Sequence, residues 1–230
     1  MKKFAITMRM GNEKTLFDQI NHDYINFVEE LDILPIIIPN SIKNPIAFYN
    51  EFKFDGIILT GGGDVNPIFS KRDHTNHQEI CEGRDYIEWK LIEFGIEKKI
   101  PILGICRGMQ FINVFFGGRI IHDINLNILD IVKHVRSTHF VNIIDPIFLN
   151  KLDVSSFKVN SFHDHGLSEQ TLAPNLYTFA ISEDNVIIEG IYHPKYPIIG
   201  IQWHPERKGS NKSVDYNLVR FLIEKNTLWG

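Results

Sequence analysis

The sequence has few of the features that define several large classes of protein. It contains only two cysteines, Cys81 and Cys106, among 230 residues, too few for a disulfide framework, so a reducing compartment fits better. Every apolar run is much shorter than the roughly 18 residues of a membrane span. Arg9 ends the short apolar start too early for the core of a secretory signal. We therefore expect a cytoplasmic protein with no membrane partner.

The charge of the chain is low and evenly spread. Lysine and arginine number 24 against 28 acidic residues, which gives a net charge of −4 and a pI of about 6.2. No basic patch extends beyond the pairs at 2–3 and 98–99, so we expect no nucleic-acid partner. A hydrophobic share of 43% is ordinary for a globular protein, and the length predicts one domain over 1–230.

Apolar runs and helical spacings alternate along the first half of the chain. Strands are predicted at 4–8, 33–38, 56–59 and 100–105, with helices at 16–31, 82–98 and 110–116. This order predicts an α/β fold, with a mostly parallel sheet covered on both faces. The second half is richer in β structure, with strands predicted at 139–144, 176–181, 186–192 and 198–203 before a closing helix at 213–223. The likeliest exposed loops lie at 41–45, 64–82 and 125–137.

The most informative segment is PILGICRGMQ at 101–110. An apolar run ends at Cys106 and a helical stretch follows, which predicts a strand, a sharp turn and a helix. A thiol at such a turn lies beside the free N–H groups of a helix start, and these groups favour the thiolate. Gly104 and Gly108 leave room for a strained nucleophile elbow. Cys106 is therefore the predicted nucleophile.

A second segment, GIQWHPE at 200–206, follows a predicted strand. His204 and Glu206 are two residues apart, so in an extended chain they point the same way. A carboxylate there can hold one imidazole nitrogen while the other faces a thiol, the arrangement used in covalent acyl transfer. The alternative is a buried cysteine and an unrelated histidine at a strand end. The elbow favours the catalytic interpretation.

A third segment, LTGGGDV at 59–65, places three glycines after a strand. A backbone without side chains can bend sharply and offer an N–H group to an oxyanion. A phosphate loop is the alternative, but the Gly-Lys-Ser/Thr ending of a nucleotide P-loop is missing. Beside the elbow, an oxyanion donor is the better interpretation.

Together these segments resemble the class I glutamine amidotransferase superfamily, and within it the γ-glutamyl hydrolase branch that includes γ-glutamyl-γ-aminobutyrate hydrolases. The motifs that carry the resemblance are GGGDVNP at 61–67, GRD at 83–85, PILGICRGMQ at 101–110, VNSFH at 159–163 and IGIQWHPE at 199–206. The resemblance covers most of the chain. It implies an αβα sandwich with a central, mostly parallel sheet.

The resemblance also implies roles for individual residues. Cys106 would be the nucleophile, His204 the general base and acid, and Glu206 the residue that orients His204. The backbone amides of Gly62 and Arg107 would form the oxyanion hole. Substrate would contact Gln110, Ser161, His163 and Asp164. Family members often read SFHHQ where this chain reads SFHDH, so Asp164 and His165 put the amine-side specificity in doubt.

The implied reaction is hydrolysis of a γ-glutamyl amide through a γ-glutamyl thioester, with release of glutamate and an amine. The amine would resemble 4-aminobutyrate, or belong to a nucleotide amide such as γ-glutamyl-CDP-amidate. Neither a metal nor an organic cofactor is expected. One alternative is a glutaminase subunit that delivers ammonia to a separate synthase partner, and another is a catalytically silent binding protein. A homodimer is possible.

Several smaller features carry two interpretations each. The stretches 73–77 and 134–139 are candidates for the pocket rim. A zinc site built from three or four histidines is the alternative, but the spacings of His163 with His165 and of His134 with His139 fit no closed Cys/His pattern. Asp85 and Glu88 suit the start of a helix, or packing around the active-site loop. Arg207 and Lys208 could meet a phosphate, although a solvated charged turn is more common. Trp203 is expected to pack in the interior, and Cys81 to be an incidental thiol.

Overall fold

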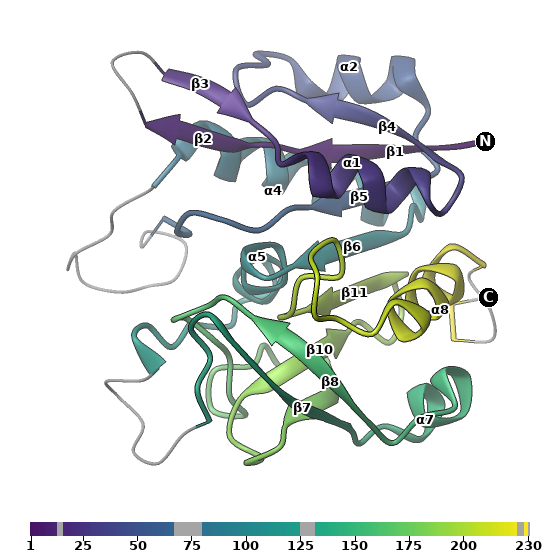
Figure 1. Ribbon diagram of the computed structural model, residues 1–230. Coiled ribbons are helices and arrows are strands. Elements are labelled where there is room, and N and C mark those ends of the chain that lie inside the picture. Colours follow the sequence, from purple (N-terminus) through teal and green to yellow (C-terminus); the bar gives the residue numbers. More distant parts are fainter. Residues whose placement is uncertain (13–15, 67–79, 125–131, 225–227, 230) are drawn as a thin grey trace.

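A computed structural model describes residues 1–12, 16–66, 80–124, 132–224 and 228–229 of the chain (Figure 1). Within these ranges, nine strands form one sheet in the order β4-β1-β5-β6-β11-β10-β9-β7-β8. Four of the strands pair in parallel with their neighbours toward one edge and four pair antiparallel toward the other, with β11 at the junction. The expected α/β class, with more β structure in the second half, is confirmed.

The parallel part comprises β4 (Ile33–Ile38), β1 (Lys2–Thr7), β5 (Gly56–Leu59), β6 (Ile102–Ile105) and β11 (Ile198–Ile201). The antiparallel part comprises β10 (Ile188–Tyr192), β9 (Tyr177–Ser182), β7 (Ser137–Ile143) and β8 (Ser156–Ser161). A separate hairpin joins β2 (Arg9–Asn12) to β3 (Leu16–Gln19).

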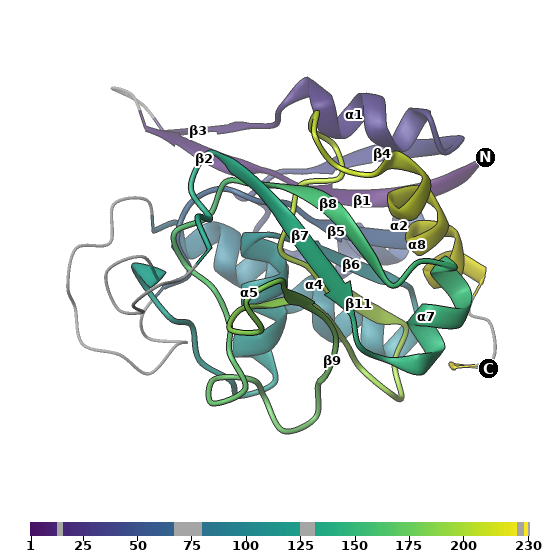
Figure 2. The same ribbon diagram turned by 60° about the horizontal axis from the view of Figure 1, so that its bottom comes forward.

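Helices cover both faces of the sheet (Figures 1 and 2). Side chains of α1 (His22–Glu29), α7 (Pro146–Leu152) and α8 (Lys212–Glu224) share one hydrophobic core with one face. Side chains of α2 (Pro45–Phe52), α4 (Glu82–Lys98) and α5 (Arg107–Phe115) share the core on the other face. Along β1, Phe4 and Ile6 enter the first core and Ala5 the second, because successive residues of a strand face opposite sides. None of the described helices is long and apolar enough to cross a membrane.

The N-terminal helix is shorter than predicted. The spacing at 16–31 predicted one helix, but Leu16–Gln19 is a strand, and α1 begins after Asn21, whose side chain accepts from the amide of Asp23. The strand forms because Phe17 packs its ring against Gly11 of the hairpin partner, where a Cβ would lie 2.3 Å from the ring. The apolar residues of β3 therefore matched helical spacing by coincidence.

Two helices that the periodicity did not predict are short and begin at a proline. α2 follows the cap Asn44, and α7 follows the cap Asp145. An Asn or Asp before Pro is itself a helix-start signal, and it would have found both. The predicted loops at 64–82 and 125–137 lie largely outside the described residues. The rim candidates at 73–77 lie wholly outside them.

The topology brings three chain segments to one edge of the sheet. β5, β6 and β11 are parallel neighbours, so their carboxyl ends lie side by side. The glycine loop follows β5, Cys106 follows β6, and the segment with His204 follows β11. Ligand sites in open α/β sheets form at such carboxyl ends, so a functional site is expected at this edge.

Candidate active site

Cys106 occupies a strained turn between β6 and α5. Its φ of 53° and ψ of −106° are unusual for a residue with a side chain, and its amide donates to the carbonyl of Ile201 at 2.8 Å. Gly108 makes the tight turn possible, because a Cβ there would lie 2.2 Å from the carbonyl oxygen of Leu59. The predicted strand, sharp turn and helix are all present, and they form a nucleophile elbow.

The structure brings the three residues of the predicted triad together. His204 Nδ1 lies 2.6 Å from Glu206 Oε1, and the Cys106 side chain is close enough to help raise the pKa of the ring. Gly61 packs against both partners, since a Cβ on it would lie 2.7 Å from His204 Cε1 and 3.4 Å from Cys106 Cβ. His204 is 2% exposed, and the Glu206 side chain is wholly buried. The Cys106 side chain, the His204 ring and the Glu206 carboxylate thus lie next to one another and are shielded from water.

The surroundings of His204 favour its charged form. Burial alone lowers the pKa of the ring, but the Glu206 carboxylate, the Cys106 sulfur and their hydrogen bonds raise it overall to about 9. At neutral pH the ring is therefore an imidazolium, which lies between the Glu206 carboxylate and the Cys106 side chain.

Asn160 of β8 holds the turn that carries His204. Its side-chain oxygen accepts from the His204 amide at 2.9 Å, and its side-chain nitrogen donates to the His204 carbonyl at 2.8 Å. The same nitrogen lies within hydrogen-bond reach of the Lys208 carbonyl at 3.2 Å. Sequence analysis did not single out Asn160, although it lies within the VNSFH motif.

The glycine loop is held from two sides. The Gly61 amide donates to the Tyr24 hydroxyl at 2.9 Å, a partner that the sequence gave no reason to expect. Burial and the nearby Glu206 raise the pKa of Tyr24 well above its ordinary value, so it stays a neutral phenol. Gly62 has a φ of 85° and Gly63 a φ of 75°, a backbone region that favours glycine. The loop therefore needs the glycines that the sequence places there.

A buried cluster of four charges, Arg84, Asp85, Glu88 and Arg107, supports the loop and the elbow. Arg107 pairs with Asp85 and with Glu88, and Arg84 Nε pairs with Glu88 Oε1 at 2.8 Å. All four are at most 2% exposed. Burial raises the pKa of Glu88, but the two guanidinium groups outweigh it and hold the pKa below its ordinary value. We call this group the buried ion cluster.

The buried ion cluster reaches the backbone of the glycine loop. Arg84 donates to the carbonyls of Thr60 and Gly62, each at 2.5 Å. Of the two roles expected for the acidic residues of α4, packing around the active-site loop is thus confirmed. The helix cap is instead Cys81, whose sulfur accepts from the Arg84 amide, so Cys81 is not an incidental thiol.

The predicted substrate-contacting residues lie together but differ in exposure. Gln110 Nε2 donates to the His165 carbonyl at 3.0 Å, and the Ser161 hydroxyl donates to the His134 carbonyl at 2.6 Å. Both residues are buried. His163 is buried as well, and its ring nitrogens lie near the His165 carbonyl and Glu189. The Asp164 side chain is 64% exposed. Contact with substrate remains a prediction for all four.

A cavity of about 260 Å³ lies against the glycine loop. Two arginines, Arg9 from β2 and Arg207 from the turn after Glu206, line it together with Tyr24, Gly61 and Gly62. The Arg207 guanidinium also stacks over the Phe162 ring at 4.8 Å. Arg207 was a candidate for contact with a phosphate, whereas Arg9 was missed because the hairpin that carries it was not predicted.

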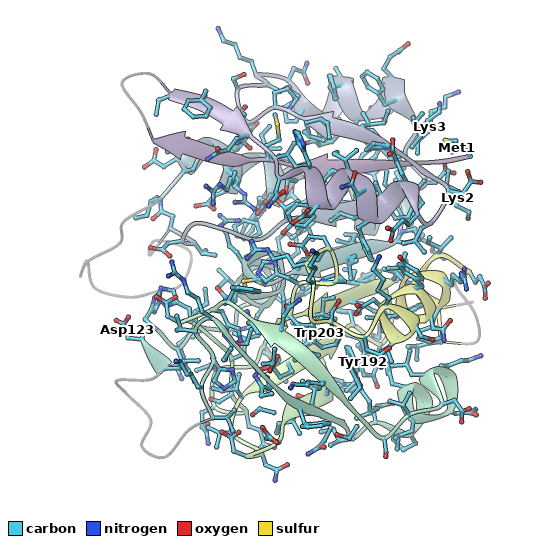
Figure 3. All side chains as sticks on the ribbon, in the orientation of Figure 1. Met1, Lys2, Lys3, Asp123, Tyr192 and Trp203 are labelled. Carbon is cyan, nitrogen blue, oxygen red and sulfur yellow. The ribbon has the colours of Figure 1, made fainter. Side chains whose placement is uncertain are left out.

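Trp203 serves the interior, as expected. The residue, labelled in Figure 3, is fully buried. Its indole N–H donates to Asp215 of α8 at 2.8 Å. It therefore joins β11 to α8 directly before His204.

Comparison with known proteins agrees with the fold and identifies the family. The family model for peptidase C26 matches residues 4–206. The protein NtpR of Enterococcus hirae is 33% identical over 94% of this chain and 91% of its own length. The γ-glutamyl-γ-aminobutyrate hydrolase PuuD of Escherichia coli is 29% identical over 89% of this chain and 84% of its own length. The crystal structure of a glutamine amidotransferase from Thermotoga maritima aligns with 97% of this chain and 84% of its own, with a TM-score of 0.62 at 14% identity.

A sandwich with a nucleophile elbow and a histidine–carboxylate pair at neighbouring strand ends defines a class I glutamine amidotransferase-like architecture. The match to the family model covers most of the sequence, and the chain belongs to the peptidase C26 family. It is accordingly a hydrolase that acts on amide bonds.

The buried ion cluster predicts a large stability effect for Glu88→Gln. The change leaves two buried guanidinium groups incompletely paired, and breaking a buried ion pair costs about 3–5 kcal/mol in the free energy of unfolding. Glu93→Gln, in the exposed Lys90–Glu93 pair of the same helix, should cost at most about 1 kcal/mol. Urea unfolding of the two variants measures the difference. Equal losses would contradict the structural role of the cluster.

The raised pKa of His204 predicts a pH-dependent stability. The folded pKa of about 9 exceeds the ordinary 6.5, so between these values the folded chain holds a proton that the unfolded chain has lost. The contribution of His204 to stability is therefore complete below pH 6.5 and declines as the pH rises to 9.

In Glu206→Gln, the titration midpoint of His204 should fall, because the carboxylate is the strongest influence that raises the pKa. The decline in stability then moves to lower pH. NMR titration of the ring and unfolding at a series of pH values measure both effects, with Glu93→Gln as the control. An unchanged midpoint in Glu206→Gln would show that the carboxylate does not tune the ring.

Proposed function

We propose that this protein hydrolyses the γ-amide bond of a γ-glutamyl compound, with Cys106 as nucleophile, His204 as general base and acid, and Glu206 as the residue that orients His204. The single observation that carries the proposal is the juxtaposition of Cys106, His204 and Glu206 beside the glycine loop, with His204 hydrogen-bonded to Glu206 and both Cys106 and His204 packed against Gly61. The similarity to PuuD, named as a γ-glutamyl-γ-aminobutyrate hydrolase, supports the choice of substrate class.

In the proposed mechanism, the Cys106 thiolate attacks the γ-carbonyl carbon and the carbonyl π electrons move to the oxygen. The His204 imidazolium gives its proton to the leaving nitrogen, the C–N bond breaks, and a γ-glutamyl thioester remains on Cys106. Neutral His204 then takes a proton from water, whose oxygen attacks the thioester. The C–S bond breaks, glutamate leaves, and the Cys106 thiolate and the His204 imidazolium are restored, so the cycle needs no external oxidant or reductant.

The amides of Gly62 and Arg107 are the proposed oxyanion donors. The Gly61 amide already donates to Tyr24, which leaves Gly62 as the next donor along the loop. Arg107 is the first residue of α5, where an amide has no acceptor within its own helix. The buried ion cluster contacts both segments, through Arg84 at the glycine loop and through Arg107 at the start of α5. These contacts support the positions of the two proposed donor amides before substrate binds. A single oxyanion donor typically contributes about 2.7–4 kcal/mol to transition-state stabilisation.

The cavity beside the glycine loop favours an amine that carries an anionic group. Arg9 and Arg207 would face the carboxylate of a 4-aminobutyrate-like amine or the phosphate of a nucleotide amide. Ammonia has no group for two guanidiniums to bind, so this cavity favours the hydrolase over a glutaminase subunit that supplies a synthase partner.

The first test is glutamate release from a panel of γ-glutamyl compounds, with glutamine included. The native chain should release glutamate from at least one compound, and Cys106→Ala should abolish release because no thioester can form. Cys81→Ala, which changes the other thiol, should keep most of the activity. A native chain that cleaves none of the panel, with a Cys106 that is alkylated no faster than Cys81, would favour a silent binding protein.

The second test concerns the leaving group. Arg9→Ala should raise KM for γ-glutamyl-4-aminobutyrate roughly tenfold or more, because a hydrogen bond to a charged group contributes about 1.5–3 kcal/mol. γ-Glutamyl-butylamide has the same chain length without the carboxylate, and its KM should change little. Lys208→Ala, a nearby exposed cation that does not line the cavity, is the matched control. Equal effects on the two substrates would contradict recognition of an anion by Arg9.

A further inference from the structure

A second cluster of chemically active side chains, His134, His139, His163 and Glu189, lies inside the antiparallel half of the molecule. His139 is on β7 and Glu189 on β10, while His134 precedes β7 and His163 follows β8. All four are at most 3% exposed. None has a step in the proposed reaction, although His163 is also a predicted substrate contact. We call these residues the histidine cluster.

The histidine cluster has the dimensions of a metal site. Glu189 Oε1 lies 3.5 Å from His134 Nδ1 and 3.7 Å from His163 Nε2, and the ligand atoms of the three residues all lie within 4.8 Å of one another. Tetrahedral Zn²⁺ with bonds of about 2.0–2.2 Å separates its ligand atoms by about 3.3–3.6 Å. Small shifts of the three side chains would therefore bring their ligand atoms to coordination distance of one ion.

The hydrogen bonds of His163 leave two acceptors facing each other. Its Nδ1 lies 2.9 Å from the His165 carbonyl, which can only accept, so Nδ1 carries the hydrogen. In the neutral ring, Nε2 then presents a lone pair toward the carboxylate of Glu189. Among the described groups, His163 Nε2, both ring nitrogens of His134 and Glu189 Oε2 have no hydrogen-bond partner. A cation would satisfy the lone pairs of His163 Nε2, of one ring nitrogen of His134 and of the Glu189 carboxylate.

The surrounding contacts hold the cluster in position. The His163 amide and the Ser161 hydroxyl both donate to the His134 carbonyl, at 3.2 and 2.6 Å, which fixes the two segments relative to each other. His139 Nε2 lies 3.1 Å from Glu189 Oε1 and can orient that carboxylate. A carbonyl behind one ligating histidine and a hydrogen bond to a ligating carboxylate are typical supports of a metal centre.

We propose that His134, His163 and Glu189 bind one divalent transition-metal ion, for which Zn²⁺ is the best match, with His139 orienting Glu189. Two imidazoles and a carboxylate are a known donor set for this ion. The sequence predicted no metal because these ligands come from separate segments and form no local motif.

The ion would have a structural consequence for the site. It would fix the loop at 161–165, whose His165 carbonyl accepts from Gln110. The proposal does not depend on the proposed function, since metal binding is measured directly.

The experiment uses the full chain carrying Cys106→Ala, so that the active-site thiol cannot bind the metal. After dialysis against a chelator, Co²⁺ titration should give the visible absorption of tetrahedral Co²⁺, and loading with Zn²⁺ should leave one ion per chain by mass spectrometry. His134→Gln and Glu189→Gln should abolish binding. His139→Gln should weaken affinity by about 10–100-fold, as expected for a residue behind a ligand.

Two matched variants should retain the metal. His193→Gln changes another buried histidine, and Asp164→Asn changes the partly exposed group formed with Asp123 and His165. Loss of the ion in Asp164→Asn, with retention in His134→Gln, would overturn the assignment. If the cluster variants do not fold, the Cys106→Ala chain still decides: no Co²⁺ absorption and no rise in melting temperature with Zn²⁺ would also overturn it.

Discussion

Complete pairing within the buried ion cluster is the constraint on which the site depends. Two guanidinium and two carboxylate groups are removed from water, which costs several kcal/mol for each ion unless every charge is paired at close range. The pairing can be complete only when α4, the start of α5 and the glycine loop occupy one arrangement. Electrostatics deep in the molecule thus fixes backbone positions at the strand ends.

That constraint explains how the strained backbone conformation of Cys106 can be maintained. Cys106 sits at a positive φ, and the neighbouring loop passes through two glycines at positive φ. Such conformations persist only where the surroundings hold them in place. Here the ion pair of the Arg107 side chain with Asp85 anchors the backbone directly after Cys106. Arg84 donates to two carbonyls of the glycine loop, and Tyr24 accepts from the amide of Gly61 in the same loop. The site is therefore organised in the absence of substrate.

The parts of this protein that could be predicted from its sequence are those that local patterns encode. Apolar runs identified the parallel strands, and the residues around Cys106 identified the elbow. The Tyr24–Gly61 bond, the Asn160 clamp and the arginine partners of α4 were missed, because each joins residues that are distant in sequence and ordinary in their local setting. The β3 strand was mistaken for helix because Leu16 continues the helical spacing of Ile20 and Tyr24.

The two halves of the sheet meet at β11, and this junction connects their chemistry. Gln202, two residues before His204, donates its amide to the carbonyl of Glu189 at 2.9 Å, and its side chain lies 3.3 Å from Gln110. The turn that carries the proposed base is thus bonded to the strand that carries the carboxylate of the histidine cluster. A displacement of Glu189 would reach Gln110 by two routes, through Gln202 and through the carbonyl of His165. For this reason the antiparallel half acts as a support for Gln110 and for the loop at 161–165, while the parallel half carries Cys106.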